Sequence, residues 1–220
     1  MCLKNITRKS PHIMHNIFRK KVDLEIINKI NRAVDEASTI DSFEILIPPQ
    51  SVRILTPFKD QLRSQCPEVN WNDKTYVVIR TVTEKGNQAS QGWHFDNLKE
   101  TALIVLKSAE GEENGDLLIR PDLRKSYDSI FMYTLTKVFW TNPIVWFILR
   151  IKKIRNRFFT RITLKPGDVM IFNGSTTYHG NLPVSSGMRR TILLHNDQLF
   201  ADSWVTKLFH KLNKLYLYKK

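Results

Sequence analysis

Three side chains in this sequence have types and spacing that could hold one metal ion. His94 and Asp96 stand two residues apart in the stretch GWHFDN (92–97), and His179 follows much later in YHG (178–180). Residues two apart on a β-strand point to the same face of a sheet, so His94 and Asp96 can project together. A histidine from a neighbouring strand would add a third ligand. Two imidazoles and one carboxylate leave other positions of the metal open, which suits Fe(II) sites at which oxygen reacts.

A pair of arginines later in the chain could bind an anion beside such a metal. The segment 188–195 has strand character, and alternation along it places Arg189, Thr191 and His195 on one face and Arg190 on the other. A planar guanidinium holds a carboxylate with two parallel hydrogen bonds, and a buried guanidinium needs such a partner. We therefore favour Arg189 over Arg190 as the anion-binding residue. Thr191 would lie beside it. His195 is expected to pack at the end of the strand, and the alternative is a role beside the metal ligands.

The residue types alone leave the metal and the site itself open. Mixed nitrogen and oxygen ligands also suit Mn(II) and Zn(II). A single histidine is more often a core residue and a single aspartate a turn residue, so the prediction depends on the whole set. His12 and His15, three residues apart, could hold a metal on one helix face, but no third ligand stands near them in the sequence. Trp93 and Phe95 are expected to face away from the site and to pack.

The segments around these residues indicate an antiparallel β core with helices before and after it. β-Branched and aromatic runs bounded by Gly and Pro predict strands at 43–47, 76–82, from 94 onward, 101–107, 116–120, 161–164, 169–173 and 188–195. Between them, 111–115 is expected to be an acidic turn and 166–168 the turn of a hairpin-like pair. Apolar residues at helical spacing predict helices at 22–38 and 57–66. This order indicates the α+β class, with a sandwich or barrel of short strands.

The length of the chain, its apolar runs and its cysteine content limit the classes of protein to which it could belong. A chain of 220 residues suits one domain with a substantial core, and we treat 1–220 as a single domain. No apolar run reaches the ~20 residues that span a bilayer. The N-terminus lacks the apolar core of a signal peptide, and Cys2 and Cys66 are too few for a disulfide framework. These features predict a cytoplasmic protein, in a reducing compartment that would help keep iron ferrous.

The net charge of +13 gathers in three places. Residues 1–32 carry eight basic and two acidic side chains and begin with an arm (1–21) that is expected to be loose. Residues 122–165 carry ten basic and two acidic side chains, and most of this stretch is an insertion rich in aromatic residues, about 123–159. The segment 200–217 shows the pattern of a basic amphipathic helix. Such patches favour an anionic partner or serve only solubility, and the apolar stripes could equally pack on the β core.

The order of these residues resembles a known superfamily. His94-x-Asp96, then His179, then Arg189 is similar to the Fe(II)/2-oxoglutarate-dependent dioxygenases, closest in style to the phytanoyl-CoA hydroxylase and prolyl hydroxylase branches. The stretch KPGDVMIFNGSTTYHGNLPVSSGMRRTILLH (165–195) resembles their distal half, with a Pro-Gly-Asp turn, an apolar strand, the ligand histidine and an arginine-bearing strand. The resemblance covers about 74–198, just over half of the chain, and does not extend to the flanking regions.

The resemblance implies a fold, a site and a reaction. The fold would be a double-stranded β-helix (jelly-roll) core with flanking N- and C-terminal helices and a helical insertion. The metal ligands would be His94, Asp96 and His179 for Fe(II), while Arg189 would bind the distal carboxylate of 2-oxoglutarate with Thr191 nearby. The reaction would consume O₂ and 2-oxoglutarate, release succinate and CO₂, and hydroxylate or desaturate a substrate. Related halogenases lack the carboxylate, so Asp96 argues against halogenation.

The substrate and partners are less defined than the reaction. The basic and aromatic insertion favours a small-molecule or lipid-like, anionic substrate, with the insertion as its lid or as a contact with an anionic membrane surface. One alternative is a nucleic-acid dealkylating dioxygenase, but Thr191–Asp197 lacks the second arginine of that branch. Another is a non-catalytic jelly-roll module that binds an anionic surface.

Overall fold

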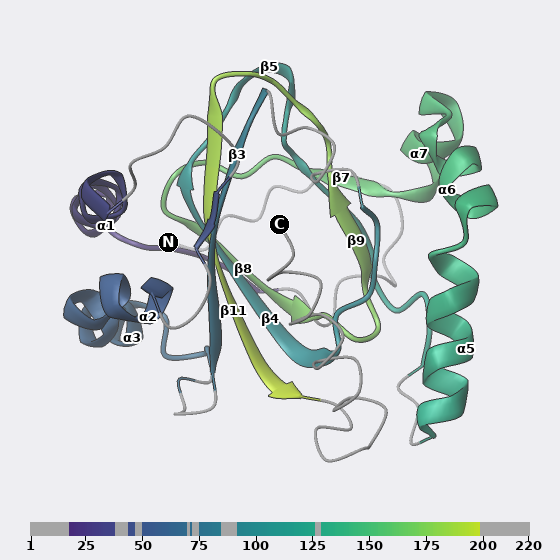
Figure 1. Cartoon of the computed structure of the whole chain (residues 1–220), viewed down its shortest axis with the longest axis horizontal. Coiled ribbons are helices and arrows are strands. Elements are labelled where there is room, and N and C mark those ends of the chain that lie inside the picture. The colour runs from purple at the N-terminus through teal and green to yellow at the C-terminus, as the bar shows by residue number, and fades with distance from the viewer. Residues whose placement is uncertain are drawn as a thin grey trace, which may run out of the picture.

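Two antiparallel β layers face each other in the computed structural model, which describes residues 18–37, 44–46, 50–69, 71, 75–84, 92–125 and 129–198 (Figure 1). The larger layer is a six-stranded sheet in the order β1-β8-β4-β11-β3-β2. Its strands are β1 (Phe18–Lys21), β2 (Glu44–Leu46), β3 (Tyr76–Thr83), β4 (Leu98–Lys107), β8 (Asp168–Asn173) and β11 (Met188–Gln198). The chain thus has the antiparallel β core that the sequence predicts.

The facing layer is smaller. It contains the three-stranded sheet β7-β6-β9, and the two-stranded sheet β10-β5 lies at one end of the molecule (Figure 1). The strands are β5 (Glu110–Asn114), β6 (Leu117–Arg120), β7 (Thr160–Ile162), β9 (Tyr178–Asn181) and β10 (Val184–Ser186). From β7 onward the chain crosses between the layers, because β7 and β9 lie in the smaller sheet while β8 and β11 lie in the larger one.

The larger sheet is buried on both faces, and alternation along its strands separates two cores. On β11, Ile192 and Leu194 point outward and pack with the helix before the sheet. Leu193, between them, points into the space between the layers, where it meets Met170 and Phe172 of β8. Side chains that point inward from β4, β8 and β11 therefore line the interior of the β core.

Three helices cover the outer face of the larger sheet (Figure 1). They are α1 (Leu24–Ala37), α2 (Gln50–Leu55) and α3 (Lys59–Gln65), with the short 3₁₀ helix η1 (Thr56–Phe58) between the last two. In α1, Ile27, Ile30 and Val34 repeat at helical spacing and are fully buried against the sheet. The first predicted helix is present, whereas the second begins earlier, at Gln50, and is interrupted by η1.

The insertion folds as helices on the opposite side of the molecule (Figure 1). They are α5 (Ile130–Trp140), α6 (Pro143–Arg150) and α7 (Lys152–Phe158). Their inner faces pack on an aromatic cluster that includes Trp93, Phe95 and Tyr178. Trp93 and Phe95 thus pack as predicted. None of the helices in the described part of the chain is long and apolar enough to cross a membrane.

Two connections differ from the sequence prediction. The turn at 166–168 does not join a hairpin, because β7 pairs with β6 while β8 pairs with β1 and β4. The turn instead carries the chain across the β core, and Gly167 fixes it by donating to the carbonyl of Val105 and accepting from the amide of Val22. The acidic segment expected to be a turn is β5, which pairs with β10. The turn was predicted because β5 is short and polar, and it therefore lacks the alternating apolar residues by which a strand is recognised in a sequence.

One prediction for the N-terminal end of the chain is wrong. Phe18–Lys21, expected within a loose arm, forms edge strand β1 and pairs with β8. Its basic residues hide the strand pattern, although charged side chains are common on edge strands. The first 17 residues, with His12 and His15, and the predicted C-terminal helix at 200–217 lie outside the described residues.

The thiol of Cys66 is expected to be unreactive in the folded protein. Cys66 is fully buried, and burial, aided by the charge of Glu68, raises the pKa of its thiol to about 11 against the opposing effect of Lys20. Because the thiolate is the reacting species, alkylation at pH 8 should be slow in the native state and fast in denaturant. A Cys2→Ser variant isolates the signal of Cys66. Equal alkylation rates with and without denaturant would contradict this burial.

Candidate metal centre

The two histidines of the predicted site are held side by side by a backbone bridge. His179 lies on β9, and His94 lies in the segment before β4. The amide of His94 donates to the carbonyl of His179 at 2.9 Å, and the amide of His179 returns a bond to His94 at 3.0 Å. This isolated bridge corrects the prediction that His94 begins a strand. The backbone pairing of this segment with β9 brings the two rings together.

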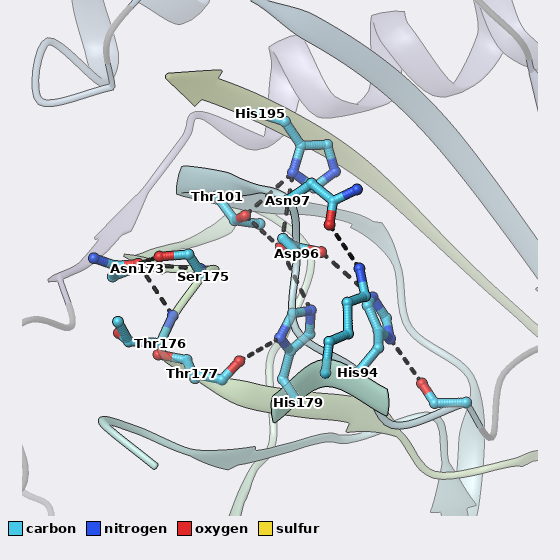
Figure 2. A network of polar contacts seen from close by, with 12 residues as sticks. His94, Asp96, Asn97, Thr101, Asn173, Ser175, Thr176, Thr177, His179 and His195 are labelled. Carbon is cyan, nitrogen blue, oxygen red and sulfur yellow. Dashed lines mark hydrogen bonds and ion pairs between the residues drawn. The ribbon is translucent and has the colours of Figure 1, made fainter. Parts of the chain in front are cut away.

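The carboxylate of Asp96 completes a three-residue cluster (Figure 2). Ligand atoms of His94, Asp96 and His179 all lie within 4.8 Å of one another. Nε2 of His94 is 3.4 Å from Oδ1 of Asp96, and Nε2 of His179 is 3.6 Å from Oδ2. The structure therefore brings together the three residues that the sequence singles out. His94 is the open side of the cluster, with its side chain 42% exposed, whereas Asp96 and His179 are buried.

Backbone carbonyls orient both rings toward the carboxylate. Nδ1 of His94 lies 2.9 Å from the carbonyl oxygen of Gly92, and Nδ1 of His179 lies 3.0 Å from that of Thr177. A neutral ring that donates from Nδ1 keeps the lone pair of Nε2 free, and this is the usual support of a metal-binding histidine. The turn before β9 is itself fixed, because Oδ1 of Asn173 accepts a bond from the hydroxyl of Ser175 at 2.7 Å.

The charges in the cluster suit a cation. Burial lowers the pKa of His179 to about 4, so its ring is neutral at pH 7 and available as a ligand. Burial raises the pKa of Asp96, but His179, His94 and His195 lower it, and the lowering prevails. An ionised carboxylate surrounded by imidazoles attracts a shared proton or a metal cation.

Thr101 and His195 hold Oδ2 of the Asp96 carboxylate in place. The sequence did not single out Thr101, and His195 was expected at the end of its strand. The hydroxyl of Thr101, on β4, donates to Oδ2 of Asp96 at 2.5 Å. Nδ1 of His195 lies 3.1 Å from that hydroxyl and 3.9 Å from Oδ2. His195 thus borders the site instead of only packing at the strand end. Thr101 and His195 are direct partners in the β4–β11 register, a pairing that the sequence does not reveal.

The insertion also contacts the site. The hydroxyl of Tyr133, on α5, donates to the backbone carbonyl of Asp96 at 2.7 Å and lies 2.8 Å from Oδ1 of Asn97. Nζ of Lys137, one turn later, donates to the same Oδ1 at 2.6 Å. Arg124 stacks between the rings of Phe95 and Tyr133, at 4.0 and 4.1 Å from their centroids. The helices of the insertion are therefore coupled to the segment that carries Asp96.

The two neighbouring arginines lie on opposite faces of β11, as alternation predicts. Arg190 points outward, where its guanidinium reaches Oδ1 of Asp35 at 2.7 Å and Oδ1 of Asn31 at 3.2 Å on α1. Arg189 points into the β core and is 6% exposed. A Cβ at Gly115 would lie 2.5 Å from Cδ of Arg189, so the glycine makes room for the arginine.

Arg189 is a buried cation without a bonded carboxylate among the described residues. Burial and the neighbouring charge of Arg80 lower its pKa to about 10, and Asp116 opposes this only in part. The carboxylate of Asp116 is already bound by Nε of Arg161 at 2.6 Å and by the hydroxyl of Thr163 at 2.8 Å. Thr191, fully buried, shares the inward face of β11 with Arg189. A buried guanidinium without a bonded carboxylate is a group that could pair with an anion.

Gly174 is expected to be essential to the geometry of the cluster. An added Cβ there would lie 2.5 Å from Oδ2 of Asp96 and would also meet the hydroxyl of Thr101. Gly174→Ala should therefore displace the carboxylate and weaken Fe(II) binding by about 10–100-fold, as loss of an outer partner does. Gly92→Ala is the matched control, since its Cβ would meet only Trp146, at 3.8 Å. Anaerobic metal titration measures both, and equal affinities would contradict the packing around Asp96.

Comparison with known proteins supports the fold. No protein-family model and no curated protein matches the chain. Among solved structures, a prolyl hydroxylase from Trichoplax adhaerens, in complex with a peptide of the hypoxia-inducible factor oxygen degradation domain, is 13% identical with a TM-score of 0.50, and the match covers 84% of each chain. The likeness shows the fold alone. The chain therefore has the double-stranded β-helix fold that the sequence resemblance implies.

Two further structures are similar at lower scores. A prolyl 4-hydroxylase from Phytophthora capsici is 12% identical with a TM-score of 0.44, and the match covers 80% of this chain and 54% of that one. HygX from Streptomyces hygroscopicus, with iron bound, is 10% identical with a TM-score of 0.49, and the match covers 81% and 80% of the two chains.

Proposed function

We propose that this chain is an Fe(II)- and 2-oxoglutarate-dependent oxygenase that hydroxylates or desaturates an anionic small-molecule or lipid-like substrate. The observation that carries the proposal is the combination of two imidazoles and a carboxylate with a buried arginine that has no bonded carboxylate among the described residues. The imidazole–carboxylate set suits Fe(II) with open positions, and the arginine suits a carboxylate ligand. A non-catalytic module would have no need for either feature.

The residues fit the metal. His94 and His179 present Nε2 on the side of the Asp96 carboxylate, and their Nδ1 atoms are tied to carbonyls. Thr101 holds Oδ2 of Asp96, which leaves Oδ1 to bind the ion. Small movements of the side chains would bring the three atoms to the ligand distances of a bound ion.

The residues also fit 2-oxoglutarate. Arg189 would pair with the distal carboxylate through two parallel hydrogen bonds, and the hydroxyl of Thr191 on the same face could add a third. Leu193, on the same inward face of β11, packs with Met170 and Phe172 in an apolar cluster between the layers. In such a low-dielectric interior an ion pair is strong, and water is excluded from it.

The chain's own groups hold and shield the reactants. The chemistry that Fe(II) and 2-oxoglutarate supply when bound is activation of O₂, in which one oxygen atom enters succinate and the other oxidises a substrate C–H bond as CO₂ leaves. Thr101 and His195 keep the Asp96 carboxylate in one orientation. Tyr133 fixes the backbone beside it. The exposed side of His94 is the side from which a substrate can reach the centre.

The charge beside this open side favours an anionic substrate. Nζ of Lys137 lies at Asn97, next to the ligand segment, and the negative charge of Asp96 acts on it. Burial and Arg124 lower the pKa of Lys137 while Asp96 raises it. A carboxylate or phosphate group of the substrate could take the place of Asn97 as the partner of this ammonium.

The substrate class can be tested by product mass. Fatty acids, lysophospholipids, their neutral analogues and a methylated single-stranded oligonucleotide would be incubated with enzyme, Fe(II) and 2-oxoglutarate. With the wild type, the anionic amphiphiles are expected to gain one oxygen atom or lose two hydrogen atoms. Lys137→Gln should raise the KM for these substrates and should not reduce the succinate that forms in the absence of substrate. A preference for the neutral analogues would contradict an anionic substrate. Dealkylation of the oligonucleotide would instead support a nucleic-acid dealkylating dioxygenase.

A further inference from the structure

The outer faces of the insertion helices expose an unusual amount of apolar surface. On α5, Phe131, Leu135, Val138 and Phe139 recur at helical spacing and are at least half exposed. On α6 and the residue after it, the exposed apolar residues are Ile144, Phe147, Ile148 and Ile151. Of the thirteen large hydrophobic residues that are exposed in the described part of the chain, ten lie between 131 and 154. Scattered exposed residues are ordinary, but a contiguous apolar face marks an interaction surface.

The inner faces of the same helices are fully used, so the outer face cannot turn inward. Tyr133 and Lys137 of α5 bind the segment that carries Asp96. Leu149 of α6 is buried in the aromatic cluster, together with Trp146. The hydroxyl of Tyr178 donates to the carbonyl of Trp140 at 2.6 Å and anchors the end of α5. The outer stripes therefore remain turned away from the β core.

The charged side chains that α5, α6 and α7 themselves carry have one sign. Between residues 129 and 167 the sequence has eight Lys or Arg and no Asp or Glu. A pocket of about 390 Å³ opens beside α7, lined by Arg120, Lys153, Arg157, Ile154 and Phe158. The guanidinium of Arg120 lies 5.6 Å from the ring centroid of Phe158. Three cations on an apolar floor suit a phosphate group attached to an apolar chain.

Charge complementarity decides among the possible occupants. The chain's own C-terminal segment, 199–220, carries five basic and one acidic side chain, and a second copy would present the same basic face. Either would bring like charges together. A nucleic acid would suit the charge, but it offers no apolar surface for Ile144, Val138 or Leu135. An anionic bilayer offers both phosphate groups and an apolar phase, as a basic amphipathic surface helix requires.

We propose that α5, α6 and α7 form a membrane-docking face. Its apolar stripes enter the headgroup region of an anionic bilayer, and Arg120, Lys153 and Arg157 bind the phosphate group of one lipid. Because the other side of α5 contacts the Asp96 segment, docking places the candidate centre close to the membrane surface. Docking requires no catalysis, so a His179→Ala variant should bind vesicles as the wild type does, and this separates the inference from the proposed reaction.

The test is co-sedimentation of the full chain with phosphatidylcholine vesicles with and without phosphatidylglycerol, at low and high salt. Strong binding is expected only with the anionic lipid and at low salt. Lys153→Glu combined with Arg157→Glu should weaken it at least about 25-fold, at about fivefold per charge. Ile144→Asn combined with Phe147→Asn should weaken it at least about tenfold. The matched controls on the opposite side of the molecule are Lys59→Glu and Val52→Asn, both at exposed positions, which should bind normally.

Three outcomes would overturn the docking face. The first is equal binding to neutral and anionic vesicles, or none to either. The second is a dimer in sedimentation velocity that Phe147→Asn dissociates, which would assign the face to a second copy. The third is salt-dependent binding of single-stranded nucleic acid, but not of vesicles, that the double Lys153/Arg157 variant abolishes.

Discussion

Replacing Arg189 by Met should abolish tight binding of 2-oxoglutarate and at the same time stabilise the protein without ligands. Removing one member of a buried, hydrogen-bonded charge pair costs about 2–5 kcal/mol, which raises the Kd for 2-oxoglutarate at least about 30-fold. In the absence of the ligand, Arg189 is a buried cation with no bonded carboxylate among the described residues. An unbranched apolar side chain of similar length removes that unfavourable charge, so the free energy of unfolding should rise by about 1–2 kcal/mol.

Arg190 is the matched control. It is a buried arginine on the same strand, but it points to the other face of the sheet and has bonded partners there. It is 2% exposed and bonded to Asp35, Asn31 and the hydroxyl of Thr81. Arg190→Met should lower the free energy of unfolding by about 1.5–3 kcal/mol, since hydrogen bonds of charged groups are lost. It should leave 2-oxoglutarate affinity unchanged. Urea unfolding and anaerobic calorimetry measure the two quantities, and a loss of stability in Arg189→Met would contradict an anion site there.

Removing a metal ligand is expected to have the second large effect. Fe(II) at 100 times its Kd should stabilise the folded protein by about 2.7 kcal/mol. For a domain of this size, that raises the Tm by about 5–10 °C. In His179→Ala the rise should vanish, because His179 supplies one of the three ligand atoms that the described residues bring together. Thermal unfolding under anaerobic conditions, with and without Fe(II), measures the difference.

His195→Ala is the control for this experiment. Its ring is also buried near Asp96, but at 3.9 Å from Oδ2 and bonded to Thr101 it acts on the carboxylate rather than on the metal. Loss of such an outer partner should weaken metal binding by about 10–100-fold and leave the rise in Tm visible at higher Fe(II) concentration. If His195→Ala removed the rise and His179→Ala kept it, the assignment of ligands would be wrong.

The residues of the candidate centre could be named from the sequence because their order in the chain carries the information. The structure brings ligand atoms of His94, Asp96 and His179 within 4.8 Å of one another and buries Arg189. Alternation along one strand separated Arg189 from Arg190. Binary patterning also predicted the long strands and α1, whose apolar residues repeat strongly. These features depend on local sequence alone.

Features that depend on contacts between distant segments could not be predicted. The pairing of Thr101 with His195 follows from the β4–β11 register, which contains a shift between Arg190 and Thr191 that no sequence rule supplies. The contact of Tyr133 with the Asp96 segment depends on how the insertion docks on the β core. For the same reason, the sequence did not decide whether the apolar residues of α5 pack on the β core or face solvent. In the structure Tyr133 is buried on one face of the helix, and Phe131 and Leu135 are exposed on the other.

The measurement that tests the proposed oxygenase most directly is succinate formation from 2-oxoglutarate. Oxygenases of this kind turn over slowly without substrate, so the assay needs no knowledge of the substrate. Wild-type protein should form succinate only with Fe(II) and O₂ present. In His94→Ala the rate should fall more than about 100-fold, since loss of an outer partner alone costs about 10–100-fold. No succinate from the wild type, or an equal rate in His94→Ala, would contradict the proposed centre.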